Sequence, residues 1–123
     1  MHLTVLAVPE CPNAPLLEER LAAALEGLAG VSVSREVIFT DGEAARWGMH
    51  GSPTLLIDGT DPFAGPGQPA SMSCRLYRDD DGRACGAPSV SQLRHAVEQA
   101  WVTANSEAHS TTGGAGSGPR GGR

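Results

Sequence analysis

The stretch MHLTVLAVPECPNAP, residues 1–15, leads from an apolar strand into a helix and places a cysteine at the junction. Residues 3–8 form an apolar run, as in a strand buried on both faces. Pro12 is tolerated in a first helical turn, so the helix is expected over residues 12–28. A thiol at a helix start faces unpaired N–H groups and the positive end of the helix dipole, which favour its thiolate form. Cys11 is therefore the leading candidate for a reactive group.

The rest of the chain alternates between strand and helix patterns. We expect the order βαβαββα, with a short helix between a Thr40 cap and Gly48 and a last helix that begins at a Ser89–Gln92 capping box. A long loop rich in Gly and Pro should fill residues 60–72. The strands are expected at residues 3–8, 31–37, 54–57 and 74–77.

These elements predict an α/β domain with a mixed four-stranded sheet covered by helices. The helical crossover makes the first two strands parallel and adjacent, and the last two strands should pair antiparallel. Trp47 and Trp101 lie on apolar helical faces, where we expect core residues. The domain should span residues 1–104. Residues 105–123 are rich in Gly and Ser and have no apolar side chain larger than alanine, so they predict a disordered tail.

Composition narrows the class of function. The net charge is −5, and no basic patch with interleaved aromatic residues is present, so nucleic acid is not an expected partner. The apolar runs are shorter than the about 20 residues that span a bilayer, and the first residues do not resemble a signal peptide. We therefore expect a cytoplasmic protein with no membrane partner and no cofactor. In the cytoplasm, three cysteines suit thiol chemistry better than a disulfide framework.

Three motifs resemble the thioredoxin fold over residues 1–104. They are Cys11-Pro12-Asn13-Ala14 after the first strand, Gly51-Ser52-Pro53-Thr54 before the third, and Gly86-Ala87-Pro88-Ser89 before the last helix. In order, they are similar to its active-site turn, its cis-proline loop and its glycine turn. The resemblance implies that Pro53 faces Cys11 and that the Ser52–Pro53 bond is cis. It also implies that the backbone before the proline holds an extended thiol substrate.

Ala14 departs from that pattern, because it stands where a C-x-x-C motif has its second cysteine. A one-cysteine site must resolve its mixed disulfide with a partner thiol or another cysteine of the chain. Simple antiparallel pairing of strand 74–77 would place Cys74 at the far end of the sheet, about 16 Å from Cys11, unless the long loop folds back. Cys85 precedes the glycine turn, which approaches the cis-proline in thioredoxins. Geometry favours Cys85 as the resolving thiol.

A narrower resemblance favours Cys74 instead. The motifs C-P-N, G-S-P-T and S-C-R-L-Y are similar to those of small bacterial thioredoxin-like proteins that often carry the name alkylmercury lyase. Cys11 and Cys74 occupy the two cysteine positions of that group. This resemblance implies a soft metal such as mercury as a ligand of the two thiolates, with or without lyase activity. The choice between Cys74 and Cys85 stays open.

The leading hypothesis is a cytoplasmic thiol–disulfide oxidoreductase-like protein whose partner is a protein or small-molecule thiol or disulfide. Cys11 would attack, the backbone at Ser52 and Pro53 would position the substrate, and Cys74 or Cys85 would resolve. The alternatives are a mercury-binding dithiol protein and a non-catalytic interaction module.

Four other residues are weaker candidates for a role at the site. His50 either assists Cys11 or faces solvent, and Glu10 could carry a proton. Asp58 and Asp61 are expected to be turn residues.

Overall fold

The structure is a computed structural model that describes the backbone of residues 1–113 and the side chains of residues 1–104. It is a mixed α/β fold. Its main sheet has the strand order β2-β1-β4, in which β1 (His2–Ala7) lies parallel to β2 (Ser32–Val37) and antiparallel to β4 (Thr54–Ile57). The parallel pairing of the first two strands confirms the prediction from the helical crossover.

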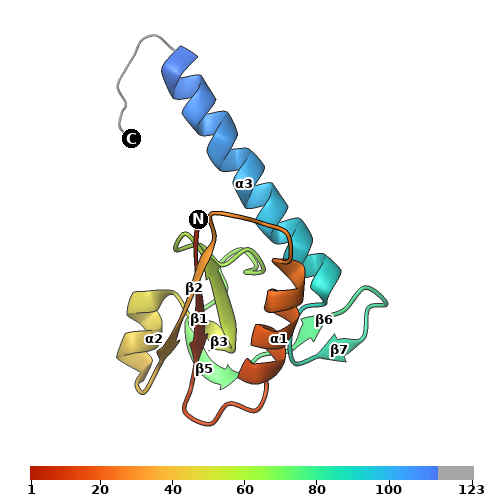
Figure 1. The fold of residues 1–123 in the computed structure, drawn as a ribbon. Helices are drawn as coiled ribbons and strands as arrows, with labels where there is room; N and C mark the ends of the chain where they lie inside the picture. The colour runs from red at the N-terminus through yellow and green to blue at the C-terminus, as the bar shows by residue number, and fades with distance from the viewer. Residues whose placement is uncertain (114–123) are drawn as a thin grey trace.

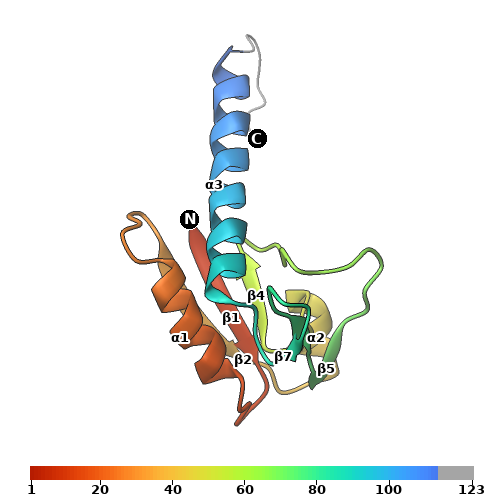
Figure 2. The same cartoon turned by 90° about the vertical axis from the view of Figure 1, so that its right-hand side faces the viewer.

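Helices cover both faces of this sheet (Figures 1 and 2). Helices α1 (Ala14–Ala24) and α3 (Val90–Gly113) pack together on one face, and α2 (Asp41–Trp47) covers the other. The side chains of β1 alternate between two apolar clusters, as the period of a strand requires. The cluster under α1 and α3 contains Leu3, Val5, Leu17, Leu21, Ala24, Leu55, Ile57, Ala87, Leu93 and Val97. The cluster under α2 contains Leu6, Ile38, Ala44, Met49 and Leu56.

The predicted capping box at Ser89 and Gln92 is present. The N–H of Gln92 donates to Ser89 Oγ at 3.1 Å, and the N–H of Ser89 donates to Gln92 Oε1 at 2.9 Å. Thr40 caps α2, because Glu43 N–H donates to Thr40 Oγ1 at 3.1 Å, but the Glu43 carboxylate accepts from the N–H of Phe39 at 2.7 Å rather than from that of Thr40. These contacts satisfy backbone donors at the two helix starts. The sequence thus locates the starts of α2 and α3 correctly.

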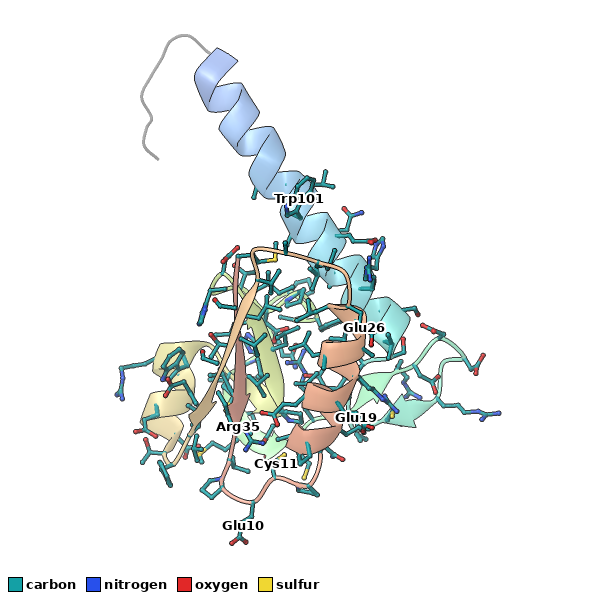
Figure 3. All side chains as sticks on the ribbon, in the orientation of Figure 1. Glu10, Cys11, Glu19, Glu26, Arg35 and Trp101 are labelled. Carbon is teal, nitrogen blue, oxygen red and sulfur yellow. The ribbon has the colours of Figure 1, made fainter. Side chains whose placement is uncertain are left out.

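The burial of four residues differs from the prediction. The alternation of apolar and polar residues over 31–37 predicts that Val33 and Val37 lie on the buried side of a half-buried strand, but they are 49% and 41% exposed on the edge strand β2. Trp47 and Trp101 were expected in the core and are 39% and 59% exposed. Figure 3 shows the physical reason for Trp101, which lies where α3 has already passed the end of the sheet.

The fourth strand of the prediction is also wrong. Instead of one strand at residues 74–77 antiparallel to β4, the chain forms two small sheets. The strand β5 (Ser71–Cys74) pairs parallel with β3 (His50–Ser52), and β6 (Tyr77–Arg78) pairs antiparallel with β7 (Ala84–Cys85). The break between β5 and β6 is at Arg75, whose buried side chain forms an ion pair with Asp61. The strand ends where the Arg75 side chain turns inward to Asp61, which supplies the counter-charge that a buried guanidinium requires.

The helix ends differ from the predicted ones. Helix α1 stops at Ala24 rather than near residue 28, and it is followed by Gly27 and Gly30, both with positive φ. Helix α3 continues to Gly113, past the predicted domain end at residue 104. Residues 114–123 of the predicted tail lie outside the described part. No helix in the described part is both long and apolar enough to cross a membrane.

Candidate thiol site

Cys11 lies in the loop that joins β1 to α1. Its N–H donates to the carbonyl of Val8 at 3.2 Å, and its carbonyl accepts from the N–H of Ala14 at 3.4 Å, so the loop is a tight turn. Glu10 has a φ of 59°, a left-handed conformation that costs energy for a residue with a side chain. Figure 3 shows the Glu10 carboxylate directed away from the protein. It is therefore not placed to pass a proton to Cys11.

The Ser52–Pro53 loop lies beside this turn. The antiparallel register pairs Leu6 at the end of β1 with Thr54 at the start of β4. The N–H of Val8 donates to Ser52 Oγ at 3.1 Å, which ties the cysteine loop to the proline loop. The Ser52–Pro53 bond is cis, as the resemblance to the thioredoxin fold implied. Ser52 and Pro53 therefore lie at the same end of the sheet as Cys11.

Cys74 is also at this end, which corrects the prediction that simple strand pairing would place it at the remote end. It pairs with Ser52 in the parallel β3–β5 sheet, and the N–H of Arg75 donates to the carbonyl of Ser52 at 3.0 Å. The long loop folds back and reverses the direction in which β5 approaches. Cys74 is exposed to solvent, and all three cysteines are free thiols.

Cys85 ends β7, and its neighbour Gly86 lies against the turn that carries Cys11. A Cβ atom added to Gly86 would overlap the side-chain amide of Asn13. The sulfur of Cys85 accepts a hydrogen bond from Arg20 Nη1 at 3.4 Å. The backbone N–H of Ala87 and then the Arg20 guanidinium lower the pKa of the Cys85 thiol. Of the two candidate resolving cysteines, Cys85 therefore carries an identified source of thiolate stabilisation.

The buried side chains of Tyr77, Arg75 and Asp61 pack against the proline loop. The hydroxyl of Tyr77 donates to the carbonyl of Pro53 at 2.6 Å. Arg75 lies over the Tyr77 ring, 4.6 Å from its centroid, and donates to Asp61 at 2.6 Å and to Thr54 Oγ1 at 3.2 Å. The side chains of Arg75 and Asp61 are only 6% and 3% exposed. These contacts fix the backbone that follows Ser52.

The pKa of Tyr77 is well above its usual value. Burial of the phenol is the main cause; Arg75 opposes it, and the charges of Asp61 and Cys11 add to it. The hydrogen bond to Pro53 places the Tyr77 hydroxyl under the proline loop, which is tied to the Cys11 loop through Ser52 and Val8. Nothing in the sequence pattern pointed to Tyr77.

The weaker candidates have local partners. His50 Nδ1 lies 3.2 Å from the carbonyl of Pro69, and Asp58 Oδ1 accepts from the N–H of His2 at 2.8 Å. Asp61 is a turn residue, since it accepts from the N–H of Phe63 at 2.9 Å, and it is also the partner of Arg75. Among residues 1–104, no three His, Cys, Asp or Glu side chains gather as metal ligands.

A groove of about 770 Å³ lies elsewhere, between the end of β4 and α3. Asp58 lines it, but the three cysteines, Ser52 and Pro53 do not. Comparison of the chain with protein-family models, with curated proteins and with solved structures finds no significant match. The cysteines and their surroundings are therefore the features of the chain that point to a function.

Proposed function

We propose that this chain is a thioredoxin-like protein that performs thiol–disulfide exchange at Cys11. One observation carries the proposal, namely that the Cys11 turn, the Ser52–Pro53 loop and the Gly86 turn meet at one end of the sheet. Cys74 and Cys85 adjoin two of these loops, so they are candidates for the second thiol. The β-α-β start and the antiparallel β4 agree with a thioredoxin-like arrangement of the main sheet.

The exchange would run in two steps. The Cys11 thiolate attacks one sulfur of the partner's disulfide, a mixed disulfide forms, and the other sulfur leaves as a thiolate that takes a proton from water. A second thiolate of the chain then attacks the Cys11 sulfur and releases the first partner sulfur, again as a thiolate. The partner is reduced by two electrons and the chain is oxidised to an intramolecular disulfide. An external thiol then returns the chain to its reduced form.

The test is reaction of the reduced protein with glutathione disulfide, followed by acid quenching and mass spectrometry. We expect wild type to form an intramolecular disulfide that includes Cys11, and Cys11→Ser to lose it. Of Cys74→Ser and Cys85→Ser, the variant that lacks the resolving thiol should accumulate glutathione on Cys11, and the other variant is its matched control. If Cys11 reacts no faster than the thiol of a short unfolded peptide, the proposal fails, and an interaction module becomes the better account.

The position of Cys74 favours a second candidate function, the binding of a soft metal such as mercury. Cys74 lies beside Ser52, at the same end of the sheet as Cys11, and thiolate pairs suit soft metals. Titration of the reduced protein with Hg²⁺ should then give one tight site that is lost in both Cys11→Ser and Cys74→Ser. The Cys85→Ser variant should keep it. Tight binding that survives loss of either Cys11 or Cys74 would contradict this function.

A further inference from the structure

The contacts of Arg20 connect α1 to the turn that carries Cys85. Its Nη1 donates to Cys85 Sγ at 3.4 Å, to the carbonyl of Ala87 at 3.0 Å and to the carbonyl of Pro88 at 3.2 Å. Arg20 Nη1 therefore forms hydrogen bonds both to the Cys85 sulfur and to the backbone carbonyls that follow it in the chain. A guanidinium is always charged near neutral pH, so it favours a negative charge on the sulfur.

The same turn touches the start of α1. Gly86 lies against Asn13, two residues after Cys11, and a Cβ at residue 86 would overlap the Asn13 amide unless that side chain moved. Arg20 belongs to the helix that begins at this turn. The helix therefore carries the Cys11 turn at its start and, further along, the group that holds Cys85.

We propose that Arg20 is a positioning residue of the thiol site, which holds the Cys85 sulfur in its thiolate form beside the turn that carries Cys11. The inference deepens the proposed function and rests on it, because it makes Cys85 the thiol that resolves the mixed disulfide. The Cys85 thiolate attacks the Cys11 sulfur, a bond forms between the two, and the partner's sulfur leaves with the electron pair and takes a proton from water. The proton of Cys85 has already passed to solvent.

Other charges surround this contact. Asp79, Asp80 and Asp81 in the β6–β7 turn line a small groove together with Arg20. Asp79 Oδ1 accepts from the N–H groups of Asp81 and Arg83, and Asp80 accepts from the hydroxyls of Ser89 and Ser91. Tyr77 pairs with Cys85 across β6 and β7, and its raised pKa keeps it neutral where a thiol titrates. Arg20 is the charged group that donates a hydrogen bond to the sulfur.

The test uses a chain in which Cys85 is the only thiol, made by Cys11→Ser and Cys74→Ser. The rate of alkylation by iodoacetamide is measured from pH 5 to pH 10. In this reaction the thiolate attacks carbon and iodide leaves, so the rate follows the thiolate fraction. The midpoint of the curve of rate against pH reports the pKa of the Cys85 thiol. With Arg20 present, we expect this midpoint to lie below the ordinary thiol value of about 8.5. Arg20→Gln should move the midpoint up towards that value and slow alkylation at pH 7 severalfold.

Two further variants separate an electrostatic role from a structural one. Arg94→Gln is the matched control, because Arg94 Nη1 donates to the carbonyls of Ala24 and Glu26 in the same manner but bonds no sulfur. It should leave the midpoint unchanged. Arg20→Lys keeps the charge and should restore part of the shift. Circular dichroism and urea unfolding establish that each variant is folded.

An unchanged midpoint in folded Arg20→Gln, or an equal change in Arg94→Gln, overturns the inference. The assay contains no Cys11 and no disulfide, so it is independent of the exchange reaction. A lowered Cys85 midpoint without exchange at Cys11 would contradict the proposed function and leave the role of Arg20 on Cys85 intact. Exchange at Cys11 together with an ordinary midpoint for Cys85 would support the proposed function and contradict the role of Arg20.

Discussion

Gly86 and Asn13 make the contact that joins the last turn before α3 to the Cys11 turn. A Cβ atom on residue 86 would overlap the amide of Asn13, so the close approach depends on a single missing methyl group. Asn13 occupies the N-cap position of α1, yet its side chain makes no capping hydrogen bond. Its role in this structure is therefore the contact with Gly86, and its removal should cost α1 little.

We expect Gly86→Ala to lower the free energy of unfolding by about 1 kcal/mol, the lower end of the range for an inserted methyl group, because the Asn13 amide can rotate away. The double variant Gly86→Ala with Asn13→Ala should recover most of that loss. Gly42→Ala is the control, since the nearest atoms to its added Cβ lie 3.9 Å away. Urea unfolding is measured for wild type, the two single variants Gly86→Ala and Asn13→Ala, the double variant and the control. Additive effects of the two substitutions would show that residues 13 and 86 do not touch in solution.

Single residues could be predicted from the sequence where the signal lies in the neighbouring residues. Residues whose contacts come from distant parts of the chain were missed. Cys11 became a candidate because a cysteine directly before a helix can be recognised from the local sequence, whatever the rest of the fold does. Arg20 was missed because its contact with Cys85 spans 65 residues of chain. Tyr77 was missed because its partner is a backbone carbonyl, which no side-chain pattern reveals.

Among the elements, the loop between β4 and β5 is held by its buried ion pair. Asp61 comes from the loop and Arg75 from the segment between β5 and β6, and their side chains are 3% and 6% exposed. Without its carboxylate partner, the Arg75 charge would stay buried and uncompensated. The pair therefore fixes the loop, and with it the approach of β5 to β3.

Asp61→Asn should lower the free energy of unfolding by about 3 kcal/mol, since it leaves a buried guanidinium without a counter-charge. The matched control is Glu98→Gln, which removes the carboxylate of an exposed ion pair with Arg94 and should cost about 0.5 kcal/mol or less. Urea unfolding of both variants provides the comparison. A similar small loss in the two variants would mean that the Asp61–Arg75 pair is hydrated in solution.

This pair also explains where the prediction of elements succeeded and failed. The strand at 54–57 was placed correctly because four consecutive apolar or β-branched residues lie between turn residues. The strands between residues 71 and 85 were predicted wrongly, because the path of the backbone there depends on a tertiary ion pair and on pairing with residues 50–52. Tertiary contacts of this kind override local strand propensity.

For the molecule as a whole, the single tyrosine links stability to alkaline pH. Burial raises the pKa of Tyr77 well above its ordinary value of about 10, so the fold favours the neutral phenol. A raised pKa contributes stability that is fully present below the unfolded value of about 10. That contribution is lost progressively as the pH rises beyond it.

We therefore expect the free energy of unfolding of wild type to fall between pH 9.5 and pH 11.5 more steeply than that of Tyr77→Phe. At neutral pH the variant should be about 1 kcal/mol less stable, because it lacks the hydrogen bond to Pro53. Urea unfolding at pH 7 gives the stability difference, and urea unfolding between pH 9.5 and pH 11.5 gives the two slopes. Since the chain has one tyrosine, phenolate absorbance reports Tyr77 directly. Ionisation near pH 10 in the folded protein would contradict the prediction.

The exposure of β2 has a consequence for how copies of the protein meet. In the described part β2 pairs with β1 alone, so its outer row of backbone N–H and C=O groups is open to another strand. Addition of a second β2 centred on Arg35 would bring two guanidinium groups face to face. Arg35 Nε lies 2.8 Å from Glu18 Oε2, so a second strand would also have to displace or accommodate this ion pair. A charged residue in the middle of an open edge strand thus disfavours pairing of two copies along that edge.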